Sequence, residues 1–125
     1  MARPSENELK ILQILWDQGP SSVRDVHEKI SENKDSGYTT TLKLMQIMAS
    51  KGIALRDTSS RTHIYSAALS EQKTKKDLLS RFISATFNGS SSSLVMEALG
   101  NGQTTQEELD EIKALISTIE KTNKQ

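Results

Sequence analysis

Apolar residues recur at helical spacing along the first 31 residues of the chain. Ser5, followed three positions later by Glu8, fits a capping box, in which a hydroxyl and a carboxylate each accept a backbone N–H at a helix start. A Gly-Pro pair at 19–20 marks a stop, and Ser22 offers a second cap three residues before Asp25. We therefore predict two short amphipathic helices. Their apolar stripes are Leu9, Ile11, Leu12, Leu15 and Trp16 in the first, and Val23, Val26, His27 and Ile30 in the second.

A third helix is predicted from about Tyr38 or Thr39 to Lys51, after a polar loop at 31–37, with Gly52 as its terminator. At 100° per residue, this helix has two different faces. The face expected to pack inward carries Thr41, Leu44, Met45 and Met48. The face expected to point outward carries Thr39, Thr40, Lys43, Gln46, Ile47 and Ser50.

Two short strand-like pieces follow at residues 53–57 and 62–67, and the polar turn 58–61 joins them as a hairpin. Three helices followed by a hairpin is the element order of a winged helix, in which the third helix enters the DNA major groove and the hairpin is the wing. We therefore predict a winged-helix DNA-binding domain over residues 1–68.

The second half of the chain, residues 69–125, is expected to form a helical dimerisation domain. Helices are predicted over 70–87 and 91–99, and a third begins at a capping box of Thr104 and Glu107. Apolar residues of the last helix recur at alternating spacings of three and four, which indicates a helix–helix seam. Three short helices have little to pack on within one chain. The residues expected at the dimer interface are Leu78, Phe82, Phe87, Leu94, Leu109, Ile112 and Ile116. The fold class is therefore mainly α, with an N-terminal winged helix-turn-helix and a C-terminal helical region.

Composition narrows the function classes. The 125 residues hold 16 basic and 16 acidic side chains, so the net charge is zero and gives no global signal for nucleic acid. From residue 36 to 65, however, the only acid is Asp57, beside four basic residues: Lys43, Lys51, Arg56 and Arg61. A locally basic third helix and wing are what contact with phosphates requires.

The sequence offers no catalytic or cofactor chemistry. Without cysteine there is no disulfide, thiol nucleophile or thiolate metal ligand. The two histidines lie far apart and form no metal-ligand cluster, and no nucleotide-binding glycine loop or nucleophile motif is present. We expect no enzyme activity, no cofactor and no metal. The polar N-terminus and the lack of a long apolar run lead us to expect a cytoplasmic protein with no direct membrane binding.

Candidate DNA contacts lie on the third helix and at the wing tip: Tyr38, Thr39, Thr40, Lys43, Gln46 and Arg61. Glutamine can bind adenine through two hydrogen bonds, and an arginine at the wing tip suits a phosphate or minor-groove contact. The alternative is that these residues form an ordinary solvated face and turn. His63, two residues before Tyr65, is expected to be a half-buried structural residue.

Together these segments resemble the penicillinase repressor family of the BlaI, MecI and CopY type. The resemblance covers nearly the whole chain and rests on the order and spacing of short stretches rather than on one motif. The stretches that carry the resemblance are residues 8–16 ending in Leu-Trp, residues 23–26, the Tyr-Thr-Thr start and Lys-Gly end of the third helix, Tyr65, residues 87–90 with Leu94-Val95, and residues 107–109.

The resemblance implies a homodimer that binds an inverted-repeat operator and represses nearby genes. Such genes often encode a β-lactamase and a membrane zinc-peptidase sensor, which would be a further partner. This chain departs from the family pattern at Thr41, where valine is usual, at Ile47, where arginine is common, and at His63, which replaces an aromatic residue. The Asn-Phe pair that is cut in β-lactam-responsive members corresponds here to Glu97-Ala98.

Two functional hypotheses follow. The first is a DNA-binding transcriptional repressor, and the second is a protein-interaction module that keeps a winged-helix scaffold without binding DNA. The basic, threonine-rich outer face of the third helix favours the first.

Overall fold

The computed structural model describes residues 3–31 and 37–123, except the side chain of Ser31. The chain divides into two compact units, Met1–Asp77 and Leu78–Gln125. In order, the elements of the described residues are α1 (Glu6–Gln18), β1 (Ser21–Ser22), α2 (Val23–Ser31), α3 (Tyr38–Lys51), β2 (Ala54–Asp57), β3 (Ile64–Ala67), α4 (Glu71–Phe87), α5 (Ser91–Gly100) and α6 (Gln106–Asn123). The predicted loop at 31–37 falls largely outside the described residues.

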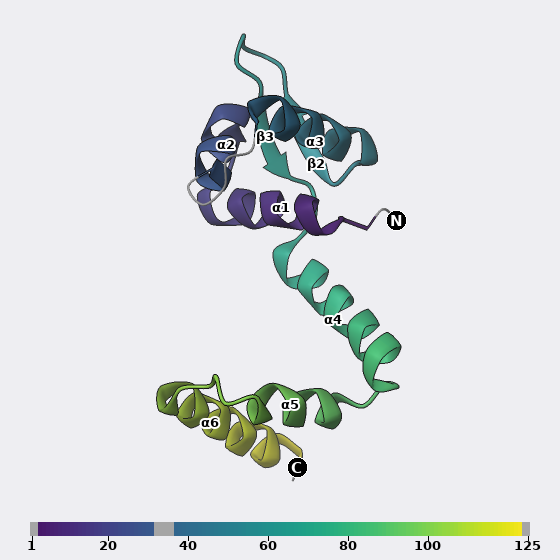
Figure 1. Cartoon of the computed structure of the whole chain (residues 1–125), viewed down its shortest axis with the longest axis vertical. Helices are drawn as coiled ribbons and strands as arrows, with labels where there is room; N and C mark the ends of the chain where they lie inside the picture. The colour runs from purple at the N-terminus through teal and green to yellow at the C-terminus, as the bar shows by residue number, and fades with distance from the viewer. Residues whose placement is uncertain (1–2, 32–36, 124–125) are drawn as a thin grey trace. The chain divides into compact units, whose positions relative to one another are not determined.

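The N-terminal unit is a winged helix, as predicted. Helices α1, α2 and α3 pack with a small sheet, and the turn between β2 and β3 projects from them (Figure 1). The sheet is antiparallel in the order β1-β3-β2. Strand β3 pairs with β2 from Ala54 opposite Ala67 to Asp57 opposite Ile64. The hairpin that the sequence predicted is therefore the wing.

The short strand β1 was missing from the sequence prediction. Ser21 pairs with Tyr65 and Ser22 with Ile64. Two serines carry no hydrophobic alternation, so this strand exists only through its pairing with a segment more than 40 residues away. Ser22 also caps α2 as expected, because its hydroxyl accepts the Asp25 N–H at 3.1 Å.

One apolar core holds the winged helix together. The buried apolar residues come from the three helices and the sheet: Ile11, Leu12, Leu15, Val23, Val26, Met45, Met48, Ile53, Ala54 and Tyr65. The predicted inner face of α3 is confirmed by the burial of Thr41, Met45 and Met48. This packing fixes which face of α3 remains outside.

Helix α3 ends where its sequence predicts. Gly52 has φ 81° and ψ 11°, a left-handed conformation that glycine adopts without the steric cost of a Cβ. Its N–H lies within hydrogen-bonding reach of the carbonyls of Ala49 and Met48 at the end of the helix. The chain then enters Ile53, whose N–H also bonds the Met48 carbonyl at 3.0 Å.

Trp16 joins α1 to the segment that leads into α4. Its indole N–H donates to the Leu69 carbonyl at 3.0 Å, and its ring packs partly buried against the core. Ser70 follows immediately and caps α4, since its hydroxyl accepts the Lys73 N–H. The boundary predicted at 68/69 thus precedes α4, and we retain it as a proposal for where the DNA-binding part ends.

The second unit contains α4 from Leu78 onward, together with α5 and α6. Asn88, with φ 52°, and Gly89, with φ 82°, turn the chain after α4, and Ser90 caps α5. The capping box of α6 consists of Thr105 and Glu108, not Thr104 and Glu107 as predicted. Both threonines stand three residues before a glutamate, so the local pattern could not distinguish them. The predicted fold class is confirmed.

Candidate nucleic-acid interface

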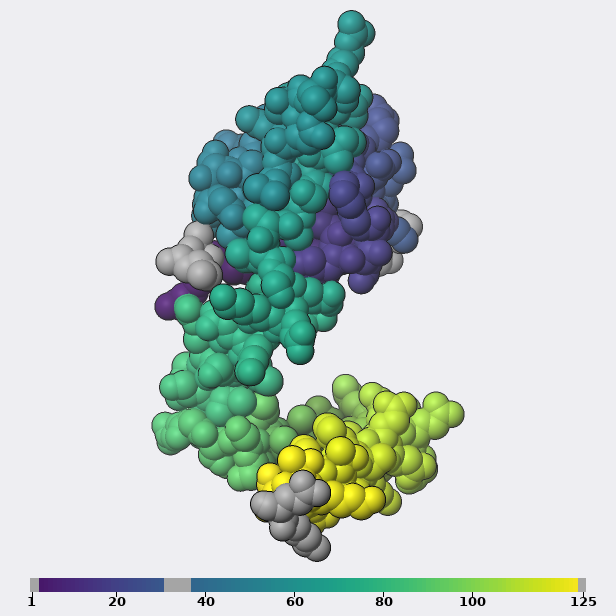
Figure 2. Space-filling view, turned by 180° about the vertical axis from the view of Figure 1, so that it is seen from behind, coloured from purple at the N-terminus to yellow at the C-terminus, as the bar shows by residue number. Residues whose placement is uncertain are grey.

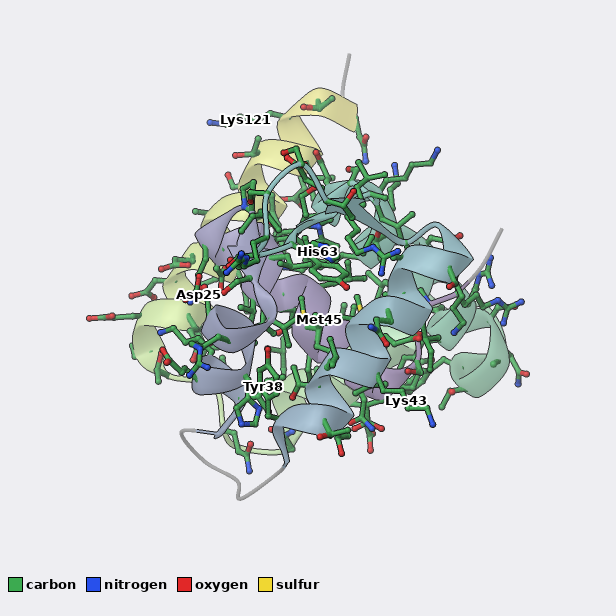
Figure 3. All side chains as sticks on the ribbon, turned by 90° about the horizontal axis from the view of Figure 1, so that it is seen from above. Asp25, Tyr38, Lys43, Met45, His63 and Lys121 are labelled. Atoms are coloured by element: carbon green, nitrogen blue, oxygen red, sulfur yellow. The ribbon has the colours of Figure 1, made fainter. Side chains whose placement is uncertain are left out.

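The outward face of α3 is polar and open to solvent. All six residues predicted on it are exposed: Thr39, Thr40, Lys43, Gln46, Ile47 and Ser50. Lys43 points away from the unit while Met45 points into it (Figure 3). No acidic residue occurs anywhere in Tyr38–Lys51. The face therefore combines hydrogen-bonding side chains with positive charge and lacks any group that would repel phosphate.

The N-terminus of α3 is also open. Gly37 occupies the cap position and provides no side-chain hydrogen bond, while its carbonyl accepts the N–H groups of Thr40 and Thr41. The positive end of a helix dipole and its first amides favour anions. This helix start is thus electrostatically compatible with the phosphate backbone that its side chains would approach.

Contacts with α2 fix the first turn of α3. The Tyr38 ring meets the His27 ring edge-on, with centroids 5.6 Å apart and an interplanar angle of 90°. His27 Nδ1 also lies 3.0 Å from the Thr41 hydroxyl oxygen, which is buried with its side chain. Burying a hydroxyl without a hydrogen-bond partner is unfavourable. His27 provides that partner for Thr41, whereas an apolar residue at position 41 would not need one.

His27 is a residue whose role sequence reasoning missed. It was placed on the apolar stripe of α2, and its spacing of 14 residues from Thr41 gave no local signal. Tyr38, by contrast, was predicted as a DNA contact. The structure leaves it 44% exposed at the start of α3, with its ring against α2. Tyr38 is thus both packed against α2 and accessible at the start of α3.

The wing is a short, ordered turn that projects from the unit (Figure 2). Asp57 accepts the Ser59 N–H at 2.9 Å, and the Ser60 hydroxyl donates to the Thr62 carbonyl at 2.9 Å. The hydrogen bonds from the Ser59 side chain and backbone hold the pKa of Asp57 below its usual value. The one carboxylate of the wing is thus used to shape the turn.

Arg61 lies exposed in this turn, as predicted, on a different element from the α3 residues. Arg56 on β2 is exposed as well. The predicted DNA contacts therefore form two groups within one unit, five on α3 and one on the wing. In winged-helix DNA-binding domains, the helix enters the major groove of DNA and the wing contacts the DNA backbone.

The expectation for His63 was wrong. It was predicted to be half-buried in phase with Tyr65, and Tyr65 is indeed 1% exposed. Strand β3, however, begins only at Ile64, so His63 belongs to the turn and is exposed. Alternation along a strand does not extend into a turn that projects beyond the core.

The residues predicted at a dimer interface lie in the second unit, on α4, α5 and α6. None of the described residues of these helices is fully buried. Phe82 and Ile116 are each 50% exposed, and the Phe82 and Phe87 rings meet at 5.8 Å. Leu78, Phe87, Leu94, Leu109 and Ile112 are half-buried.

Five further large apolar side chains of these helices are exposed. They are Leu79, Val95, Met96, Leu115 and Ile119. Met96 is the most exposed of them, at 74%. Large apolar side chains exposed in such number on short helices are typical of an interaction surface.

Within the described residues, no group of three or more His, Asp or Glu side chains is placed to hold a metal ion. In the same part of the chain, every helix is too short or too polar to cross a bilayer.

Comparison with known proteins decides the family. A family model described as penicillinase repressor matches residues 4–118. The chain belongs to the penicillinase repressor family. Its winged helix and helical C-terminal unit are thus the parts of one family architecture rather than a chance combination of two small folds.

Individual members of the family are similar at lower identity. The transcriptional regulator BlaI of Mycobacterium tuberculosis is 33% identical over 66 residues, which span 52% of this chain and about half, 48%, of that protein. The methicillin resistance regulatory protein MecI of Staphylococcus aureus is 23% identical over 113 residues, 90% of this chain and 92% of MecI. The penicillinase repressor of Bacillus licheniformis is 20% identical over 112 residues, covering 90% and 88% of the two chains.

Proposed function

We propose that this protein is a transcriptional repressor that binds an inverted-repeat DNA operator as a homodimer. The observation that carries the proposal is the outward face of α3, exposed, basic and free of acids, next to a projecting wing with Arg61 at its turn. The family supports it, since similar proteins are named as transcriptional regulators and repressors.

Each part of the interface has a distinct role in this proposal. Thr39, Thr40 and Gln46 of α3 contact base edges in the major groove, while Lys43 neutralises a phosphate or binds a guanine. Arg61 contacts the backbone or minor groove next to it. Tyr38, exposed at the start of α3 with its ring against His27, is a further DNA contact and sets the position of the helix start.

The exposed apolar side chains of the second unit support the homodimer part of the proposal. Seven large side chains of α4, α5 and α6 are at least 46% exposed. They are Leu79, Phe82, Val95, Met96, Leu115, Ile116 and Ile119. Exposed apolar area on this scale is unfavourable in water at about 25 cal/mol per Å². A second copy presents the same surface and can cover it symmetrically. Two winged helices would then reach half-sites about one helical turn, or a small multiple, apart.

The genes under control are inferred from the family alone. We propose that they include β-lactamase-type or sensor-peptidase genes, and that the membrane zinc peptidase is a partner. The protein would then act in the cytoplasm on its own operon.

A gel shift with the full chain and the DNA upstream of its own gene tests the proposal. The expected result is a discrete complex that resists excess unrelated duplex and weakens steeply with salt. If the chain binds no duplex, or binds all duplexes equally, the repressor proposal fails and the alternative of a protein-interaction module replaces it.

A further inference from the structure

Ile47 is an apolar side chain in the middle of a polar face. It is 39% exposed on α3, where the inward face is already filled by Thr41, Met45 and Met48. At 100° per residue, its direction lies between those of Lys43 and Thr40. Both of these neighbours are exposed. Ile47 therefore points where the proposed DNA contacts point, and not into the core.

The surroundings of Ile47 favour DNA over an apolar protein surface as the partner. The whole of α3 lacks acids, its outward face carries the exposed Lys43, and its N-terminus is uncapped by any side chain. A partner that covers Ile47 must also cover this positive, hydrogen-bonding face. Duplex DNA offers the complementary negative charge.

Within the major groove, isoleucine can be matched by one group. Each base pair presents hydrogen-bond donors and acceptors there, and the only apolar group is the 5-methyl of thymine. Covering a donor or acceptor with an alkyl side chain leaves it without water and without a partner, which is unfavourable. An isoleucine that faces the groove therefore selects for thymine and against the other bases.

We propose that Ile47 is a specificity-determining residue that contacts a thymine methyl group in the operator. The inference rests on the proposed DNA binding through α3. It adds to that proposal the identity of the base, thymine, that the Ile47 side chain recognises. Apolar contact with thymine is an established kind of base recognition in general, and here it assigns a role to a residue that cannot hydrogen-bond.

The experiment begins with selection of duplexes from a random DNA library by the full chain and by three variants. Ile47→Ala removes most of the contact, and Ile47→Arg replaces it with a side chain that pairs with guanine. Leu55→Ala is the matched control, because Leu55 is also an exposed apolar residue, 61% exposed, on β2 rather than α3. Circular dichroism confirms that each variant is folded.

The second step replaces thymine by deoxyuridine, one position at a time, in the duplex that the unaltered chain selects. This change removes the methyl group alone. We expect affinity to fall about fourfold at one position in each half-site, the transfer effect of one buried methyl group. Ile47→Ala should show no loss there, Ile47→Arg should select guanine at that position, and Leu55→Ala should behave as the unaltered chain does.

The inference is overturned if the unaltered chain binds thymine and deoxyuridine duplexes equally at every position. It is also overturned if Ile47→Ala keeps the same selected sequence and the same sensitivity to deoxyuridine. Either result, obtained with a chain that does select a sequence, leaves the repressor proposal standing. Failure of the unaltered chain to enrich any sequence overturns both proposals.

Discussion

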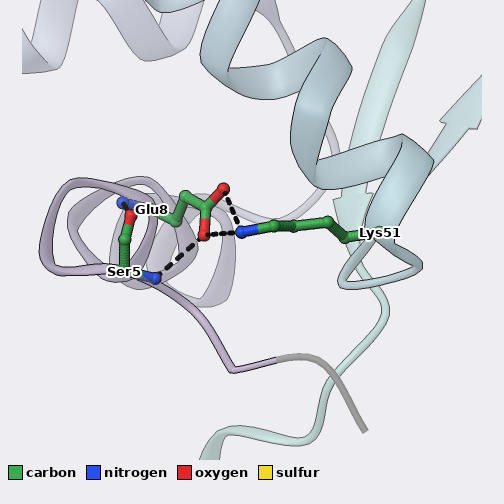
Figure 4. Close-up of polar contacts among 3 residues, drawn as sticks. All are labelled: Ser5, Glu8 and Lys51. Atoms are coloured by element: carbon green, nitrogen blue, oxygen red, sulfur yellow. Dashed lines mark hydrogen bonds and ion pairs between the residues drawn. The ribbon is translucent and has the colours of Figure 1, made fainter.

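The ammonium group of Lys51, in the last turn of α3, lies 2.9 Å and 3.1 Å from the two carboxylate oxygens of Glu8 near the start of α1. The same carboxylate accepts the Ser5 N–H at 2.9 Å (Figure 4). Its side chain is 3% exposed, whereas that of Lys51 is 39% exposed. One carboxylate therefore completes the capping box of α1 and anchors the end of the helix that carries the candidate DNA contacts.

Replacing Glu8 by glutamine should destabilise the winged helix. The ion pair is lost and a buried group is left with poorer partners, so we expect a loss of about 1–3 kcal/mol in the free energy of unfolding. Glu6→Gln is the matched control, because Glu6 is exposed in the first turn of the same helix and should cost only a few tenths of a kcal/mol. Urea unfolding followed by circular dichroism measures both. Equal losses would show that the pair with Lys51 has no special role.

The contribution of Glu8 should also depend on pH. Burial raises the pKa of this carboxyl, but hydrogen bonds from Ser5 and the Lys51 ammonium outweigh it, so the pKa lies below its ordinary value of 4.5. A group with a lowered folded pKa stabilises the fold fully above its unfolded pKa and loses that effect as the pH falls through the folded one. The stability gap between the unaltered chain and Glu8→Gln should therefore be constant from pH 7 to about 5 and shrink below 4.5. A gap as large at pH 3 as at pH 7 contradicts this.

Local sequence patterns predicted most of the fold. The Ser5 capping box, the two faces of α3, its end at Gly52 and the hairpin all follow from residues close together in the chain. The misses depend on distant partners. Strand β1 needs β3, and the ion pair of Glu8 and Lys51 joins residues 43 positions apart.

The candidate site was predictable to the extent that helical periodicity decides exposure. Helical periodicity predicts Lys43 on the outside and Met45 on the inside, and the structure has both there. It could not show that His27 supports Tyr38 and Thr41, since helix packing brings these side chains together. Strand alternation placed His63 wrongly, because β3 begins at Ile64, two residues after the predicted start of the strand at residue 62. The DNA and dimer contacts themselves remain predictions.

A charge introduced into the apolar surface of α6 should separate the proposed dimer. Ile116 is 50% exposed on the predicted seam, and a carboxylate there would be buried without a partner in the dimer. We expect Ile116→Asp to sediment as a monomer at concentrations where the unaltered chain is a dimer. Ala114→Asp, on the opposite side of the same helix, is the control and should stay dimeric. An unaltered chain that is monomeric, or an Ile116→Asp dimer, rejects the assigned interface.

The position that corresponds to the family's Asn-Phe cleavage site should resist a sensor peptidase of that specificity. Glu97 and Ala98 are both exposed, within α5. A pocket shaped for phenylalanine gains little from alanine, and a charged glutamate is poorly accepted in place of asparagine. After incubation with an Asn-Phe-specific peptidase, fragment masses should show an uncut chain.

The double variant Glu97→Asn with Ala98→Phe is the control for that experiment and should be cut. If the unaltered chain has its own peptidase, the turn at residues 100–102 is the candidate site. It is exposed and begins at the last residue of α5, and loop tips are preferred sites of nicking. Efficient cleavage between Glu97 and Ala98 in the unaltered chain would show that the departure from Asn-Phe has no consequence.

The affinity of Lys43→Ala combined with Thr40→Ala for a selected operator duplex, measured across a range of salt concentrations, tests the central claim most directly. Both residues are exposed on α3, so the fold should be unaffected. We predict weaker binding. Loss of a base contact would remove about 1–3 kcal/mol of discrimination, and loss of a phosphate contact would reduce the salt slope by about 0.9. Lys10→Ala, an exposed lysine on α1, should bind as the unaltered chain does. Unchanged affinity and salt slope in the double variant would contradict recognition through α3.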